Sequence, residues 1–305
     1  MRTTFVITAL IIACGISSDA QRAGGPPPLI REGVTERISD HVYVIPDNNV
    51  GMVPNVGIIV GTQGTFVVDT GMGARNGQTI VREMQKISRT PVLYLASTHI
   101  HPEHDLGAGG FPAHTKMIRS KAQVDEIAGA GLAQAERFAS FSPLNAELLA
   151  GSEFRKADVT FDQELAVDLG GVRVRVIAMG YNHTRGDQAF FVEPDGILFS
   201  GDVAMSALPN IGQSRSATWL GSMDRFEKLL PKLVVPSHGR VGQGPEFMVS
   251  YRNFIRDVQS RVAAHKKQGK SADESVTAIT AELQDRYPTA GQRLGGAIRA
   301  VYNEP

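Results

Sequence analysis

Short apolar runs that end in loops bearing Gly, Asp or His recur along residues 40–240. Their length and their content of Val, Ile and Phe predict β-strands. Strands are predicted over residues 42–45, 56–60, 65–68, 92–96, 116–118, 164–169, 172–178, 189–192, 196–200 and 233–236. Short turns at 61–64, 170–171 and 194–195 contain Gly or Pro, so they predict three β-hairpins.

Apolar residues at helical spacing predict helices between and after these strands. The predicted helices cover residues 78–87, 121–141 and 217–230, and three more follow residue 246. Ser271 and Glu274 form a capping box at the start of the second of these three. The apolar stripes of the C-terminal helices are typical of packing faces, so we assign them no chemistry. The insertion 121–150 is interpreted either as core or as a lid over a site.

Three histidines and two carboxylates lie directly after the strand 92–96, at His99, His101, Glu103, His104 and Asp105. Imidazole and carboxylate are the usual non-sulfur ligands of zinc, and the i, i+2 spacing of His99 and His101 lets one turned segment present both rings to one ion. A polar surface loop is the alternative. Five of the chain's eight histidines lie in this loop or in two later loops, so we interpret it as a ligand loop.

Three later residues share this setting. His183, Asp202 and His238 each stand in a Gly-bearing loop after a predicted strand. Glycine permits close backbone approach in such loops, and loops on a rigid scaffold commonly carry function. These three residues are therefore further candidate ligands.

Five motifs in order carry a family resemblance: Asp69 in Val-Val-Asp-Thr-Gly, the cluster His99-x-His101-x-Glu103-His104, His183, Asp202 in Phe-Ser-Gly-Asp, and His238 in Pro-Ser-His-Gly. Together they resemble the metallo-β-lactamase superfamily over about residues 40 to 242. The resemblance implies an α/β fold, in which an αββα sandwich of two mixed β-sheets has helices outside and the metal site at one edge of the sheets.

The resemblance also implies a role for each motif residue. The implied ligands are His99, His101 and His183 for a first metal, Glu103, His104 and His238 for a second, and Asp202 as a bridge between the two. Asp69 would hydrogen-bond within the ligand loops and fix their orientation. A carboxylate that only caps a turn is the alternative for Asp69.

Glu103 departs from the family pattern, which usually has Asp at this position. Its extra methylene moves the carboxylate outward, so a second metal would sit differently, bind more weakly or be absent. Asp105 lies one residue too late to replace it without a shift of the loop register. The expected cofactor is therefore one or two Zn²⁺ ions, with iron or manganese as alternatives.

Hydroxide on a metal is the nucleophile that such a ligand set supplies. Zinc lowers the pKa of a bound water from about 15.7 to about 7, so no activated Ser or Cys is needed. We assign catalysis to Asp202, which would orient the hydroxide and accept its proton, and to Glu103. Ser97 and Ser237 lie beside candidate ligands but lack a nucleophile elbow.

The ligand types and the N-terminus favour different substrates. The best-known zinc β-lactamases have Cys or a non-ligating Ser where this chain has Asp202. An Asp there is the pattern of thioester, lactone and phosphodiester hydrolases of the superfamily, whereas export favours β-lactams. We expect the opening of a β-lactam or lactone ring. Thioester or phosphodiester hydrolysis, a mononuclear iron dioxygenase reaction and non-catalytic metal binding are the alternatives.

The first twenty residues are typical of a secretory signal peptide. A basic start at Arg2, an apolar run over 5–14 and small residues before Ala20 make up the pattern. Cleavage after Ala20 would place the protein in the periplasm or outside the cell, and lipidation at Cys14 is the alternative. Cys14 is the only cysteine, so the cleaved protein would have neither a disulfide nor a thiolate ligand.

Charge argues against a nucleic-acid partner, because 31 basic and 31 acidic residues give a formal net charge of zero. The expected partner is a small-molecule substrate, without membrane contact unless Cys14 is lipidated. The predicted organisation is a signal peptide (1–20), an extended leader (21–39), a metallo-β-lactamase-like domain (40–242) and a helical extension packed on that domain (243–305).

Overall fold

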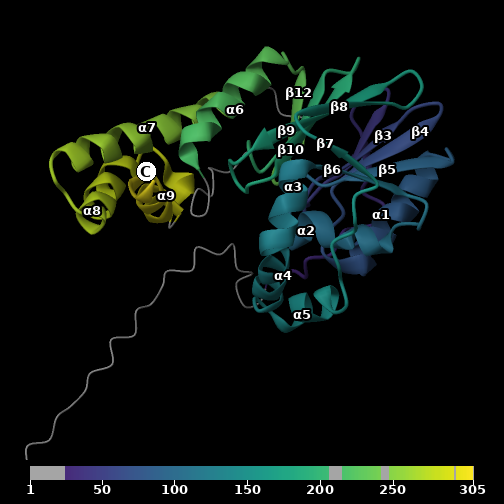
Figure 1. Ribbon diagram of the computed structural model, residues 1–305, viewed down its shortest axis with the longest axis horizontal. Helices are drawn as coiled ribbons and strands as arrows, with labels where there is room; N and C mark the ends of the chain where they lie inside the picture. Colours follow the sequence, from purple (N-terminus) through teal and green to yellow (C-terminus); the bar gives the residue numbers. More distant parts are fainter. Residues whose placement is uncertain (1–24, 206–214, 242–246, 292, 305) are drawn as a thin grey trace, which may run out of the picture.

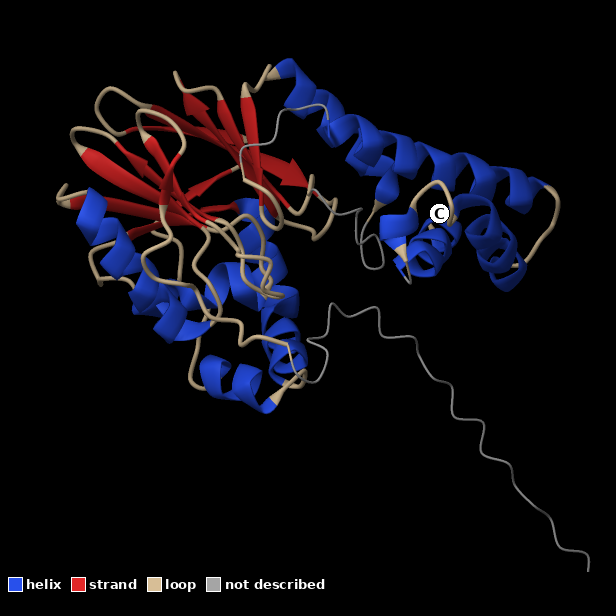
Figure 2. Cartoon of the chain, turned by 180° about the vertical axis from the view of Figure 1, so that it is seen from behind, coloured by secondary structure: helices blue, strands red, loops and turns tan. Residues whose placement is uncertain are grey.

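Two β-sheets lie face to face, with helices on their outer surfaces (Figures 1 and 2). The computed structural model describes residues 25–205, 215–241, 247–291 and 293–304. The first sheet has the strand order β1-β2-β3-β4-β5-β6-β7, and the second has the order β12-β11-β10-β9-β8. Both sheets mix parallel and antiparallel pairs. The predicted αββα sandwich is confirmed.

The strands follow the predicted apolar runs. They are β1 (Glu36–Arg37), β2 (Val42–Ile45), β3 (Val56–Val60), β4 (Gly64–Val68), β5 (Val92–Ala96), β6 (Lys116–Ser120), β7 (Val159–Phe161), β8 (Glu164–Asp168), β9 (Arg173–Gly180), β10 (Asp187–Glu193), β11 (Ile197–Gly201) and β12 (Leu233–Pro236). The sequence pattern did not predict β1 or β7, because both are very short and neither has a continuous buried face.

The helices are α1 (Gly73–Ile87), α2 (Pro102–Asp105), η1 (Leu106–Gly110), α3 (Lys121–Glu126), η2 (Ile127–Gly131), α4 (Leu132–Ala139), α5 (Pro143–Leu149), α6 (Ser216–Lys228), α7 (Phe247–Lys267), α8 (Ala272–Leu283), η3 (Pro288–Ala290) and α9 (Arg293–Asn303). Two details differ from the prediction. The first helix begins at Gly73 rather than at 78, and the π-helix η2 interrupts the stretch 121–141. The capping box at Ser271 is present.

The strand directions bring the candidate loops to one edge of the sandwich. In the first sheet β4 and β5 are parallel neighbours, so the loops after Val68 and Ala96 leave the same edge. In the second sheet β11 and β12 are parallel neighbours, so the loops that follow them also leave one edge. A hydrogen bond of 2.7 Å from Gln188 N to Thr98 O joins the two sheets at this edge.

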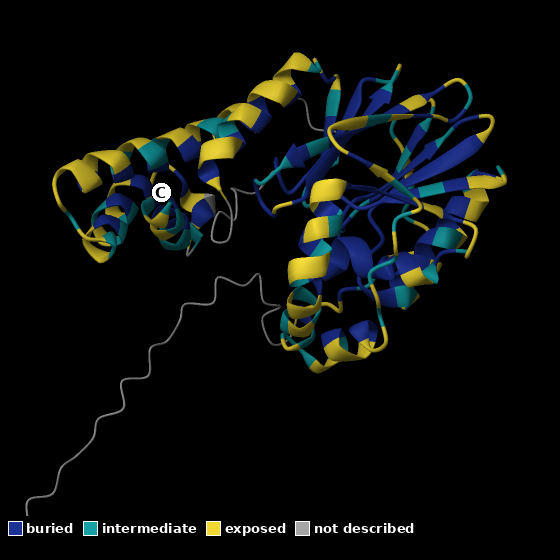
Figure 3. Ribbon diagram, viewed as in Figure 1, coloured by how far each residue is buried: buried dark blue, intermediate teal, exposed yellow. Residues whose placement is uncertain are grey.

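Apolar side chains from both sheets form the core between them. The ring centroids of Phe66 and Phe190, which come from opposite sheets, lie 5.7 Å apart, and both rings are fully buried. Phe199 packs over Gly57, where a Cβ atom would lie 2.5 Å from the phenyl ring. Figure 3 shows buried strands and exposed positions gathered on the outer helices. This close packing gives the edge loops a rigid base.

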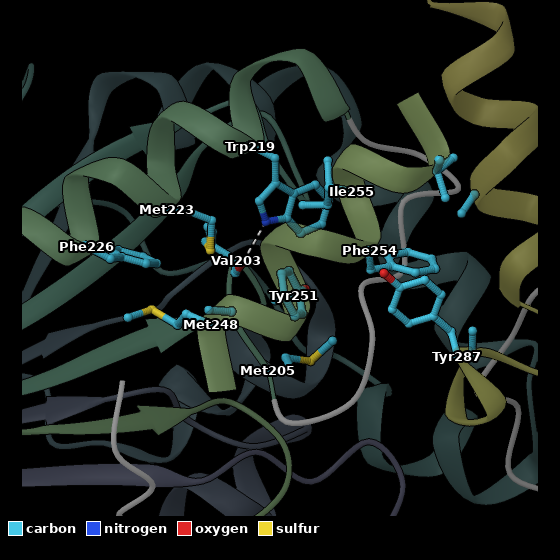
Figure 4. Packing of buried hydrophobic residues seen from close by; sticks show 14 of the residues in the cluster. Val203, Met205, Trp219, Met223, Phe226, Met248, Tyr251, Phe254, Ile255 and Tyr287 are labelled. Carbon is cyan, nitrogen blue, oxygen red and sulfur yellow. Dashed lines mark hydrogen bonds between the residues drawn. The ribbon is translucent and has the colours of Figure 1, made fainter. Parts of the chain in front are cut away.

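A second core joins the C-terminal helices to the outer face of the second sheet (Figure 4). Leu198 of β11, Trp219 and Phe226 of α6, and Tyr251 and Phe254 of α7 all belong to it, and all are buried. The apolar stripes of these helices are therefore packing faces. Helices α6 to α9 share one hydrophobic core with the sheet that carries two of the candidate loops.

Part of the predicted leader packs on α1 rather than running free. Asn76 accepts a hydrogen bond of 2.8 Å from Ile30 N and donates one of 3.0 Å to Pro28 O. Thr35 donates to the carboxylate of Glu83 at 2.6 Å. The described part of the predicted extended leader (21–39) thus contacts α1, and Ile30 is also buried in the hydrophobic core. The predicted signal peptide (1–20) lies outside the described residues. No described helix has the length and apolar character that a membrane span requires.

Helix α1 packs so closely on the segment after the ligand loop that glycine is required at Gly77. A Cβ atom there would lie 1.9 Å from Gly107 O. Ala normally stabilises a helix relative to Gly by about 1 kcal/mol. We predict that Gly77→Ala instead lowers the free energy of unfolding by about 1–3 kcal/mol, because the added methyl overpacks the contact.

Gly221 in α6 is the matched control, because a Cβ atom there would meet nothing within 4 Å. Gly221→Ala should raise the free energy of unfolding by up to about 1 kcal/mol. Urea denaturation of both variants measures the two changes. Equal stabilisation by both substitutions would show that the α1 contact is not as tight as described.

Candidate metal centre

The first loop presents its candidate ligands from the end of β5 and from the short helix α2. His99 and His101 follow β5, and His101 is the residue that caps α2. Pro102 occupies the first turn, where its fixed backbone angle and missing N–H favour helix initiation. Glu103 and His104 are then carried by α2 itself, and both side chains are buried.

The other candidates come from the second sheet. His183 lies in the turn between β9 and β10, Asp202 follows β11 and His238 follows β12. His183 and Asp202 are buried, and His238 is half-buried. The four loops thus bring residues from both sheets to one point.

His99, His101 and His183 form the first donor group. Their nearest donor atoms all lie within 4.8 Å of one another. His101 Nδ1 lies 3.0 Å from His99 Nε2 and 3.2 Å from His183 Nε2. Three imidazole nitrogens that converge in this way can hold one ion.

Glu103, His104 and His238 form the second donor group, again with donor atoms within 4.8 Å of one another. Asp202 lies between the groups, with Oδ2 3.4 Å from His183 Nε2 and Oδ1 4.0 Å from His238 Nε2. The structure therefore brings all seven predicted ligands together, and a third set of donors, His99, His104 and Asp202, spans the two groups. Their function as metal ligands stays a prediction.

Unpaired polar atoms in this cluster fit a metal. Glu103 Oε2, His104 Nε2 and Asp202 Oδ1 are buried and have no hydrogen-bond partner among the described residues. Burying such atoms without a partner is costly, so each of them needs a ligand. The donors are nitrogen and oxygen without sulfur, a set that suits zinc and also iron or manganese.

Asp69 holds the first ligand loop in place through hydrogen bonds. It accepts hydrogen bonds from Thr98 N at 2.7 Å and Thr98 Oγ1 at 3.1 Å, and it lies 2.9 Å from His104 Nδ1. His238 Nδ1 lies 2.9 Å from Val53 O. In both histidines the contact at Nδ1 turns Nε2 toward the centre of the cluster, as partners of metal-bound histidines do.

Asp105 points away from the donors. Arg119 donates to Asp105 Oδ1 at 2.8 Å and also to Oδ2, Ser97 donates to the same carboxylate, and both charged side chains are fully buried. A buried ion pair needs this degree of hydrogen bonding to offset its desolvation. Asp105 therefore does not replace Glu103, which remains the carboxylate of the second donor group.

Sequence reasoning missed the residues that hold the His183 turn. Asp187 accepts hydrogen bonds from His183 N at 2.7 Å and from Thr184 Oγ1 at 2.7 Å. Glu126 of α3 accepts from Arg185 N at 2.9 Å and from Gly186 N at 2.7 Å. The spacing of Asp187 from His183 was the single available signal, whereas Glu126 lies too far along the chain to be recognised.

Burial and neighbouring charges set the protonation of the donors. Burial, together with the adjacent histidines, lowers the pKa of His99 and His101 well below the usual range, so both rings are neutral and available as ligands. Burial opposes a charge on His104, but the charge and hydrogen bond of Asp69 raise the pKa of His104 to about 9. Burial also favours a neutral Asp202, yet His183 and His238 lower the pKa of Asp202 below its usual value.

The C-terminal helices contact the backbone of the Asp202 loop. Tyr251 of α7 is fully buried and donates a hydrogen bond of 3.2 Å to Asp202 O. Trp219 of α6 donates one of 2.6 Å to Val203 O, as Figure 4 shows. These helices therefore help to position a candidate ligand as well as to extend the core.

Comparisons with known proteins agree with this architecture. The family model of the metallo-β-lactamase superfamily matches residues 50–238. A linear primary-alkylsulfatase from Pseudomonas sp. is 22% identical over an alignment of 293 positions, which covers 80% of this chain and 54% of that protein. The chain thus spans about half the length of this relative.

Solved structures share the fold. An inverting sec-alkylsulfatase from Pseudomonas sp. matches with a TM-score of 0.71 and 18% identity, covering 88% of this chain and 49% of that one. A β-lactamase domain protein from Burkholderia ambifaria matches with a TM-score of 0.62 and 21% identity, covering 88% and 87% of the two chains.

The hydroxyl of Tyr251 should contribute to metal retention at the second donor group. Tyr251→Phe removes the donor to Asp202 O and should weaken retention of the second ion about tenfold, at the low end of the effect of outer-shell partners. Tyr287→Phe is the matched control, since the Tyr287 hydroxyl donates to Asp257 at 2.6 Å in the same helices. Metal content after dialysis against a chelator should fall only in the Tyr251 variant. Equal retention in both variants would contradict this positioning.

Metal affinity should depend on pH differently at the two donor groups. With a pKa of about 9, His104 carries a proton at pH 7 that an ion at Nε2 must displace. Affinity at the second group should rise about tenfold per pH unit from pH 7 to 9. The first group, whose His99 and His101 have lowered pKa values, should release no proton at pH 7.

Calorimetry in buffers of different ionisation enthalpy counts the protons that each group releases when it binds a metal ion. Asp69→Asn should abolish the release, and equal release from both groups would refute the assignment.

Proposed function

Because the chain belongs to the metallo-β-lactamase superfamily, we propose that it is an exported, metal-dependent hydrolase of a small ester-like substrate. The observation that carries the proposal is the pair of donor groups with Asp202 between them. Export rests on the sequence pattern of residues 1–20 alone.

A zinc ion bound by these donors would supply an acidified water as nucleophile and a Lewis acid for the bond under attack. The residues of the chain supply the rest. Neutral His99 and His101 offer ring nitrogens without prior loss of a proton. Asp202 is ionised, and its buried Oδ1 lacks a partner among the described residues. Asp202 is therefore placed to orient the attacking water and to accept its proton.

A sulfate ester is the first substrate class to test. The two Pseudomonas proteins described above are alkylsulfatases, and both match most of this chain. The structural match covers 88% of the chain, more than residues 50–238 alone could supply, so it includes part of the C-terminal helices or the leader. The low identity and half-length coverage leave the substrate itself as a proposal.

Ring opening of a lactone or β-lactam is the second candidate. Asp202 favours a lactone, because lactone hydrolases of the superfamily share this ligand, whereas the predicted signal peptide (1–20) is the feature that favours a β-lactam. Thioester and phosphodiester hydrolysis belong to the same chemical range. A single assay panel therefore separates these classes.

We predict that His101→Ala lowers both metal content and hydrolysis, the latter at least about 100-fold. His114→Ala is the matched control, because His114 is exposed and lies outside the donor groups. The assays are metal analysis and turnover of p-nitrophenyl sulfate, decyl sulfate, a homoserine lactone, a chromogenic cephalosporin, a glutathione thioester and a phosphodiester.

Full activity in a metal-free preparation would overturn the proposal. Bound iron with oxygen consumption and no hydrolysis would establish the dioxygenase alternative instead. Retained metal with no reaction on any substrate would favour a binding module.

A further inference from the structure

The insertion after β6 forms an aromatic wall beside the first donor group. The ring of Phe138 in α4 lies 5.2 Å from that of His101, and the ring of Phe141 lies 5.0 Å from that of Phe138. Phe138 is buried, and Phe141 is half-buried. The sequence left open whether this insertion is core or a lid. Its aromatic residues contact a candidate ligand, so it borders the site.

Arg137 places a positive charge on this wall. Its guanidinium carbon lies 5.8 Å from the centroid of the Phe141 ring. Phe138, the next residue of α4, carries the ring that contacts His101. Among the described residues no carboxylate lies within ion-pair distance of Arg137, whereas Arg119 pairs with one carboxylate and Arg175 with two.

The wall is fixed at both ends. At its start, the carboxylate of Glu126 accepts the backbone hydrogen bonds of Arg185 and Gly186 in the His183 turn. At its end, Asn145 of α5 donates to Phe138 O at 3.1 Å. The backbone that carries Arg137 is therefore held at a set position relative to the donors. A fixed cation recognises a ligand better than a mobile one, because less side-chain freedom is lost on binding.

The charge of the site favours an anion. The five histidine donors are neutral when they bind a metal, so two divalent ions would outweigh the charge of the two donor carboxylates. An unpaired arginine beside such a centre raises the local concentration of anions. The half-buried ring of Phe141 offers a surface for an apolar group. A neutral substrate would leave the arginine without a partner.

We propose that Arg137 is a specificity-determining residue that selects substrates in which an apolar body carries a sulfate or carboxylate group. The assignment rests on the proposed hydrolase function and narrows its substrate class. It places the negative group against the guanidinium and the carbon skeleton against the half-buried ring of Phe141.

The test is binding of octanesulfonate, which carries the charge but has no ester bond to hydrolyse. Calorimetry with the metal-loaded full chain compares it with neutral octanol. Arg137→Gln should weaken octanesulfonate binding at least about tenfold, the loss expected for one charged contact, and leave octanol binding unchanged. Arg137→Lys should recover part of the loss. Arg75→Gln is the control, because Arg75 is an exposed arginine on α1.

Unchanged octanesulfonate binding in Arg137→Gln, or no binding by the wild type, would overturn the inference. An equal loss of octanol binding would also overturn it, because the role would then be one of packing. Metal content must be the same in all variants. If octanesulfonate binding depends on Arg137 but no substrate of the assay panel is hydrolysed, the hydrolase proposal fails while the anion-binding role of Arg137 stands. If Arg137→Gln hydrolyses decyl sulfate as fast as the wild type does, the inference on Arg137 fails while the hydrolase proposal stands.

Discussion

The burial of imidazoles and carboxylates at one edge of the sandwich is the constraint on which the rest of the structure depends. Polar atoms such as His104 Nε2 and Asp202 Oδ1 are removed from water without a hydrogen-bond partner among the described residues. A bound ion would offset this cost, and the surrounding loops hold the donors in place for it. Parallel strand pairs in each sheet make the arrangement feasible, because they deliver two loops each to the same edge.

Helices outside the sandwich also hold the loops at this edge in place. Tyr251 and Trp219 tie the Asp202 loop to the C-terminal helices, and Glu126 ties the His183 turn to the insertion. Both additions therefore share hydrogen bonds with loops that carry candidate ligands. A change in either is expected to act on metal binding through these bonds, as outer-shell partners do in known metal sites.

Much of the fold was readable from the sequence, because its strands are continuous apolar runs with clear turns. The ligand grouping was also readable, since His99, His101, Glu103 and His104 are close in sequence and the later motifs follow in order. The residues that hold these loops in place could not be predicted from the sequence. Glu126 and Tyr251 act across long sequence separations, and neither residue type signals a contact by itself. The contacts of the leader with α1 could not be predicted for a related reason, because Asn76 and Glu83 make them through polar bonds.

Anomalous diffraction at the zinc edge, from crystals of the zinc-loaded chain, tests the central claim most directly. The account predicts two peaks roughly 3.5 to 4 Å apart. One should lie about 2.0–2.1 Å from nitrogens of His99, His101 and His183. The other should lie beside Glu103, His104 and His238. A single peak at the first group, or none at either, would contradict the account.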